Sequence, residues 1–107
     1  MTTPQLKQVL QTLRQGLDRV LGPQVAQVVL YGSQAREDAR PDSDIDVLVV
    51  MKDEVNYPEL MERTSEVVAN VSPQYDVVVS RAFASQTQFE NAQLPFFVNV
   101  RREGIAV

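Results

Sequence analysis

Hydrophobic residues recur at spacings of three and four over residues 4 to 21, which predicts an amphipathic helix. Thr3 before Pro4 suits an N-cap followed by a first helical residue, and Gly22-Pro23 suits a stop. The apolar positions are Leu6, Val9, Leu10, Leu13, Leu17, Val20 and Leu21. Burial of this face against the domain's own sheet is favoured over a partner-binding role, because surface helices ordinarily face their own core.

Two short apolar runs follow and predict buried strands. The first, residues 25 to 31 (VAQVVLY), is rich in valine and ends at Gly32, and the second, residues 45 to 51 (IDVLVVM), is nearly continuous. Between them, residues 33 to 38 predict a short helix and residues 40 to 43 a turn. The two strands are therefore expected to be neighbours.

The second half of the chain repeats the alternation of helix and strand. Asn56 and Pro58 mark the start of another helix, which is expected to end before Ser72-Pro73. Its shared face consists of Leu60, Met61, Thr64, Val67, Val68 and Val71. Residues 75 to 80 (YDVVVS) predict a third strand. After a polar segment between Phe83 and Phe89, a last helix is expected over residues 95 to 102, with Phe96, Phe97 and Val100 on one side and Gly104 at its end.

Composition restricts the chemistry that this chain can use. Its 107 residues fit one domain, 1–107, with 44% hydrophobic and 22% charged residues. The absence of cysteine and histidine excludes disulfides, thiolate or imidazole metal sites and histidine-based acid-base catalysis. The N-terminus predicts neither secretion nor a membrane span, so a cytoplasmic location is expected. A net charge of −4 disfavours a long nucleic acid as partner.

Asp44 and Asp46 are the first candidates for catalysis. They lie two residues apart at the start of an apolar strand, so strand periodicity places both carboxylates on one face, roughly 6 to 7 Å apart. Mg²⁺ prefers such oxygen ligands, and two ions about 4 Å apart can clamp the attacking and leaving oxygens of a phosphoryl transfer. The pair therefore predicts a metal site.

Asp76 is the third candidate carboxylate. It is the second residue of the expected strand over residues 75 to 80, and neighbouring strands lie about 4.8 Å apart. Asp76 is therefore expected to complete the same cluster as Asp44 and Asp46. A carboxylate in that place is suited to bind one metal and to accept the proton of an incoming hydroxyl.

The Gly32-Ser33 turn predicts a phosphate site. It joins a strand to a short helix, where backbone N–H groups attract phosphate, and glycine permits close approach. Arg36 and Arg40 lie on the connection to the carboxylates and are placed to meet phosphate charge.

Each motif alone also has an ordinary structural interpretation. A single Asp-x-Asp is more often a polar strand edge, and a single Gly-Ser after a strand is usually only a turn. Tyrosines 31, 57 and 75 are more often packing residues than nucleophiles, and Arg101-Arg102 more often a solvated helix end. The ordered combination of strand, Gly-Ser, ten residues, Asp-Ile-Asp, helix and a later Asp is what favours catalysis.

This combination, 32-GSQAREDARPDSDID-46 with Asp76, resembles the nucleotidyltransferase core of the DNA polymerase β superfamily, and in particular its minimal nucleotidyltransferases (MNT). The resemblance implies an α+β, two-layer fold with a small mixed sheet and helices packed mainly on one face. The MNT proteins it resembles are typically encoded beside a HEPN-domain toxin and act as its antitoxin.

By this resemblance, Gly32 and Ser33 hold the triphosphate of ATP, Asp44 and Asp46 bind two Mg²⁺, and Asp76 completes the metal site. AMP would pass to a toxin hydroxyl, expected to be a tyrosine. Many relatives carry glycine where this chain has Glu37, which places a negative side chain near the phosphate turn. The alternatives are an antitoxin that acts by binding alone and an enzyme that modifies a small molecule.

Overall fold

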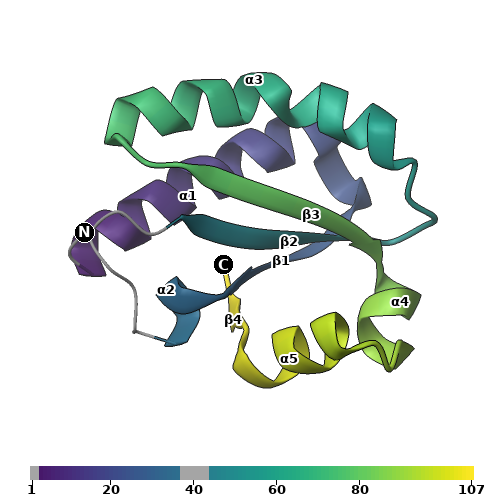
Figure 1. Cartoon of the computed structure of the whole chain (residues 1–107). Helices are drawn as coiled ribbons and strands as arrows, with labels where there is room; N and C mark the ends of the chain where they lie inside the picture. The colour runs from purple at the N-terminus through teal and green to yellow at the C-terminus, as the bar shows by residue number, and fades with distance from the viewer. Residues whose placement is uncertain (1–2, 37–43) are drawn as a thin grey trace.

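A four-stranded mixed sheet forms the centre of the computed structural model, which describes residues 3–36 and 44–107 (Figure 1). The strand order is β3-β2-β1-β4. The bounds are β1 Val25–Tyr31, β2 Ile45–Met51, β3 Val79–Ser85 and β4 Ile105–Ala106. β1 pairs antiparallel with both β2 and β4, whereas β2 and β3 run parallel. The expected mixed sheet and the neighbouring positions of the first two strands are confirmed.

Helices cover both faces of this sheet unequally (Figure 1). The two long helices, α1 (Thr3–Leu21) and α3 (Tyr57–Tyr75), lie together on one face, and the 3-10 turn η1 (Gly22–Gln24) joins α1 to β1. The shorter α4 (Gln86–Asn91) and α5 (Pro95–Glu103) lie against the other face. The α+β fold is confirmed, and α4 and α5 add a smaller layer of helices to the two layers that were expected. No helix in the described part of the chain is long and apolar enough to cross a bilayer.

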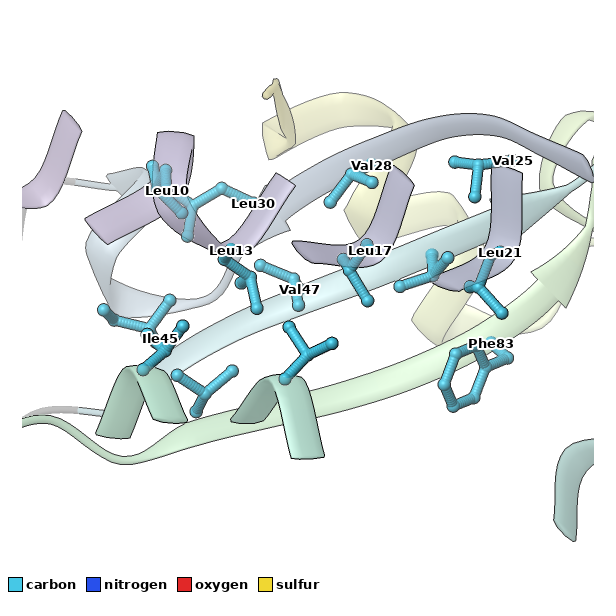
Figure 2. Close-up of a cluster of buried hydrophobic side chains, with 14 of the residues drawn as sticks. Leu10, Leu13, Leu17, Leu21, Val25, Val28, Leu30, Ile45, Val47 and Phe83 are labelled. Carbon is cyan, nitrogen blue, oxygen red and sulfur yellow. The ribbon is translucent and has the colours of Figure 1, made fainter. Parts of the chain in front are cut away.

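Alternation along β2 separates the two faces. Ile45, Val47 and Val49 are buried against α1 and α3, whereas Leu48 and Val50 are buried on the side of α5. Figure 2 shows this core, with α1 contributing Leu10, Leu13, Leu17 and Leu21. Because successive strand side chains point to opposite faces, an acidic residue at position 46 points away from the two long helices. The helix expected over residues 4 to 21 is confirmed with its buried face.

The third strand differs from the prediction. Helix α3 continues through Pro73 to Tyr75, and β3 begins only at Val79 instead of Tyr75. Asp76 ends the helix in a left-handed conformation (φ 53°), and the backbone N–H groups of Asp76 and Val77 both donate to the Ser72 carbonyl. This closure resembles the left-handed C-cap that usually holds glycine. The Tyr75 hydroxyl is 2.9 Å from the Thr12 hydroxyl of α1, a contact that favours the longer helix.

Three short elements complete the fold, and only the first of them, α2, was predicted from the sequence. Helix α2 (Ser33–Arg36) starts where expected, whereas the predicted turn over residues 40 to 43 lies outside the described residues. Helix α4 was not predicted, although the Ser85–Gln88 capping box is a sequence signal for its start. The two-residue β4 was also missed, because so short a run carries no periodicity.

Candidate active site

The two sequence motifs meet at one end of the sheet. β1 ends at Tyr31 and the antiparallel β2 begins at Ile45, so the turn after one strand lies beside the start of the other. Tyr31 and Asp46 are direct partners in this pairing. The expected neighbourhood of Gly32, Asp44 and Asp46 is therefore present.

Gly32 makes the turn and leaves room for a carboxylate. Its φ is +73°, a conformation that costs little only for glycine, and a Cβ there would lie 2.6 Å from Asp46 Oδ2. The Gly32 carbonyl accepts from the N–H groups of Ala35 (3.1 Å) and Arg36 (3.2 Å), which starts α2 at the half-buried Ser33. Strand end, turn and carboxylate thus form one compact unit.

Asp44 and Asp46 repel each other electrostatically. Partial burial raises the pKa of Asp46, the nearby Asp44 carboxylate raises it further, and the Arg36 guanidinium partly offsets both effects. Asp44 is exposed directly before β2, while the intervening Ile45 is fully buried on the opposite side. An excess of carboxylate charge beside solvent is the setting in which hard cations such as Mg²⁺ bind, so the donor set fits that ion.

Arg36 also lies at this end of the sheet. Its Nη1 is 3.4 Å from Glu103 Oε2 at the end of α5, and its charge acts on Asp46. The structure therefore brings Arg36 to the site, whereas Arg40 and Glu37 lie outside the described residues.

Asp76 does not join the carboxylate pair. It is an exposed helix cap three residues before β3, and within residues 3–36 and 44–107 no three acidic side chains are grouped closely enough to hold a metal ion. The placement expected from the sequence was wrong because the strand starts later. Ile45 N–H donates to the Val78 carbonyl instead, so Val78 is the residue of this segment that lies beside the start of β2.

A pocket of about 320 Å³ opens beside Gly32 and was not predicted. Tyr31, Gly32 and Arg36 line one side, and α5 supplies the other with Phe96, Asn99, Val100 and Glu103. The Tyr31 and Phe96 rings meet edge to face, with centroids 5.3 Å apart. Burial raises the pKa of the Tyr31 hydroxyl, and the negative charge of Asp46 raises it further. The only sequence signal was the spacing of Phe96, Asn99 and Glu103, which share one helix face.

The chain is similar to known proteins in both sequence and fold. The family model described as a nucleotidyltransferase domain matches residues 6–102. The chain belongs to this nucleotidyltransferase family. It is 27% identical to a candidate protein adenylyltransferase of Methanocaldococcus jannaschii over 82 residues, which cover 75% of this chain and 80% of that protein.

Two solved structures share the fold of this nucleotidyltransferase. One, a toxin–antitoxin complex with AMP-PNP, contains a chain with a TM-score of 0.65 and 18% identity, over 90% of this chain and 69% of the other. The second is a tri-AMPylated HEPN toxin of Shewanella oneidensis in complex with an MNT antitoxin. It matches with a TM-score of 0.55 and 17% identity over 99% of this chain and 71% of the other. The family model thus confirms the predicted resemblance to a nucleotidyltransferase core, and the two solved structures show that its fold is shared.

Proposed function

We propose that this nucleotidyltransferase is a Mg²⁺-dependent protein adenylyltransferase that acts as an antitoxin in the cytoplasm. It would transfer AMP from ATP to a hydroxyl, expected to be a tyrosine, of a cognate HEPN-domain toxin and thereby neutralise it. The observation that carries this proposal is the Asp46 carboxylate lying against the Gly32 turn, with Asp44 beside it. Similar proteins support it, since one is named as a candidate protein adenylyltransferase and another is complexed with an AMPylated toxin.

The residues divide the work between phosphate and metal. The Gly32-Ser33 turn would hold the triphosphate, Arg36 would meet its charge, and Asp44 and Asp46 would hold two Mg²⁺. Bound Mg²⁺ would stabilise the negative charge that develops on the phosphates during transfer. The acceptor oxygen would form a bond to the α-phosphorus, the bond to the β-phosphate would break, and pyrophosphate and the hydroxyl proton would be released.

A binding-only antitoxin is the second candidate, and one observation favours it. Leu94, Phe96 and Ile105 are large apolar side chains exposed around α5, with 64%, 40% and 49% of their surface accessible. Exposed apolar groups near one another are common at protein interfaces, and Leu94 and Phe96 lie two residues apart at the start of α5. An interface and a catalytic site are compatible, so the experiment must separate binding from transfer.

The test is co-expression of this chain with its proposed HEPN-domain partner, followed by mass measurement of that partner. Wild type should protect cells and add about 329 Da for each AMP group transferred. The double variant Asp44→Asn/Asp46→Asn should add nothing and fail to protect. Asp53→Asn is the matched control, because this acidic residue follows the opposite end of β2. Protection by the double variant, together with an unmodified partner in the wild-type cells, would establish the binding-only mechanism instead.

A further inference from the structure

The pocket beside Gly32 has a composition suited to a planar, uncharged ring. Two of its side chains are the aromatic Tyr31 and Phe96, and Asn99 adds a carboxamide. Arg36 and Glu103 lie 3.4 Å apart at its border, so their charges offset each other within the lining. We propose that this pocket binds the adenine base of the donor nucleotide and that Asn99 selects adenine over guanine, an inference that rests on the proposed function.

The position of the pocket follows from Gly32. This residue forms the turn beside Asp46 and also lines the pocket. A nucleotide whose phosphates lie at the turn therefore reaches the pocket with its nucleoside. The volume of about 320 Å³ is at the lower end of small-molecule sites, which suits a nucleoside better than a complete nucleotide.

Phe96 is placed to stack against a base. Its ring contacts Tyr31 at 5.3 Å and Phe97 at 5.2 Å, and both contacts are edge to face, with interplanar angles of 84°. Neither neighbour is stacked parallel to the Phe96 ring, and 40% of the residue remains exposed. An aromatic ring that is partly exposed and has no parallel-stacked neighbour is suited to stack against a base.

Asn99 supplies the hydrogen bonds that distinguish adenine. Its Oδ1 accepts from Arg102 at 3.1 Å, which orients the carboxamide and leaves that oxygen a second lone pair. A carboxamide offers one donor and one acceptor, matching N7 and the amino group of adenine, whereas guanine presents two acceptors at the same edge. Because Asn99 is exposed, the expected discrimination lies at the low end of such contacts, about five- to tenfold.

The rival occupant is the acceptor side chain of the partner protein, and binding measurements separate the two. The probes are ATP, GTP and inorganic tripolyphosphate, each titrated with Mg²⁺ into wild type, Phe96→Leu and Asn99→Ala by calorimetry. Tripolyphosphate carries no base and reports the phosphate site alone. Tyr57→Leu is the control for the loss of an exposed aromatic ring, and Asn70→Ala is the control for the loss of a carboxamide, both on α3.

Wild type should bind ATP about tenfold more tightly than tripolyphosphate and about five- to tenfold more tightly than GTP. Phe96→Leu should weaken both nucleotides about fivefold, Asn99→Ala should abolish only the preference for ATP, and tripolyphosphate should be unaffected by either change. Equal binding of ATP and tripolyphosphate by wild type would overturn the base pocket while leaving the phosphate site intact. Variants that bind ATP normally but raise the KM for the acceptor protein would assign the pocket to the acceptor. Absence of binding by all three probes would overturn the proposed function itself.

Discussion

The Asp46 carboxylate occupies the space that a side chain at Gly32 would need. An added Cβ would lie 2.6 Å from Asp46 Oδ2 and 3.4 Å from its Cγ. The clashing atom is the far end of a side chain that can rotate, so a substitution would displace the carboxylate more readily than the backbone. Gly32 and Asp46, which lie fourteen positions apart in the sequence, are thus coupled by one contact.

Gly32→Ala should therefore affect activity far more than stability. The left-handed φ predicts a loss of about 1 to 2 kcal/mol of unfolding free energy, measured by urea denaturation. Displacement of Asp46 by even about 1 Å predicts a loss of roughly 100-fold or more in AMP transfer. The matched control is Gly22→Ala, where φ is +61° and no atom lies within 4 Å of the added Cβ.

Gly22→Ala should lose similar stability and retain its activity. Equal loss of activity in the two variants would show that backbone conformation, and not the position of Asp46, limits transfer.

Asp46→Asn should stabilise the protein at neutral pH. Burial and the neighbouring Asp44 raise the pKa of Asp46, so the folded protein holds this proton more tightly than the unfolded chain does. The contribution of Asp46 is thus favourable below the ordinary carboxyl pKa of about 4 and is lost as the pH rises through the raised value. Removing the charge should add less than about 1 kcal/mol at pH 7, because the group is partly solvated and screened.

The measurement is urea denaturation of wild type and Asp46→Asn between pH 3 and pH 8. The two curves should converge at the acidic end, and Asp53→Asn should show no comparable gain at pH 7. A gain that persists unchanged at pH 3 would attribute it to packing instead of charge.

The predicted parts of the site were those fixed by local patterns. β1 and β2 were placed correctly because each is a nearly continuous apolar run with a glycine or an acidic residue at its boundary. Their antiparallel pairing then brings Gly32 to Asp46. The pocket could not be predicted in the same way, since it depends on how α5 docks. That docking is set by packing of Val100 with Val29 and Leu48, which are far away in the sequence.

The predicted start of the third strand was wrong for a related reason. The runs YDVVVS and VSRAFAS both satisfy a strand pattern locally. Tertiary contacts choose between them, since Phe83 is buried in the core and Tyr75 contacts Thr12 across 63 positions of sequence. Asp76 was therefore assigned to the third strand instead of to the end of α3.

Close packing between α1 and α3 predicts a second glycine effect. A Cβ on Gly16 would lie 2.6 Å from Val67 Cγ1, and Val67 is buried with a stiff branched side chain. Gly16→Ala gains about 1 kcal/mol of helix propensity but overpacks the helix contact, which costs about 1 to 3 kcal/mol. In the background of Val67→Ala the clash disappears, so the same substitution should become stabilising. Thermal denaturation of the four proteins in this cycle measures the coupling, and additive effects would contradict a direct contact.

Substitutions of Asp76 test whether this residue is a metal ligand on a strand or the C-terminal cap of α3. In the structure it is the one described non-glycine residue with positive φ, so Asp76→Gly should relieve strain and stabilise the protein by about 0.5 to 1 kcal/mol. In a strand, the same glycine would destabilise by a similar amount. Asp76→Asn removes the charge but tolerates the left-handed conformation, and should leave both stability and AMP transfer near wild type. Loss of transfer in Asp76→Asn at unchanged stability would instead place this carboxylate in the reaction, and would require the end of α3 to rearrange when nucleotide and Mg²⁺ bind.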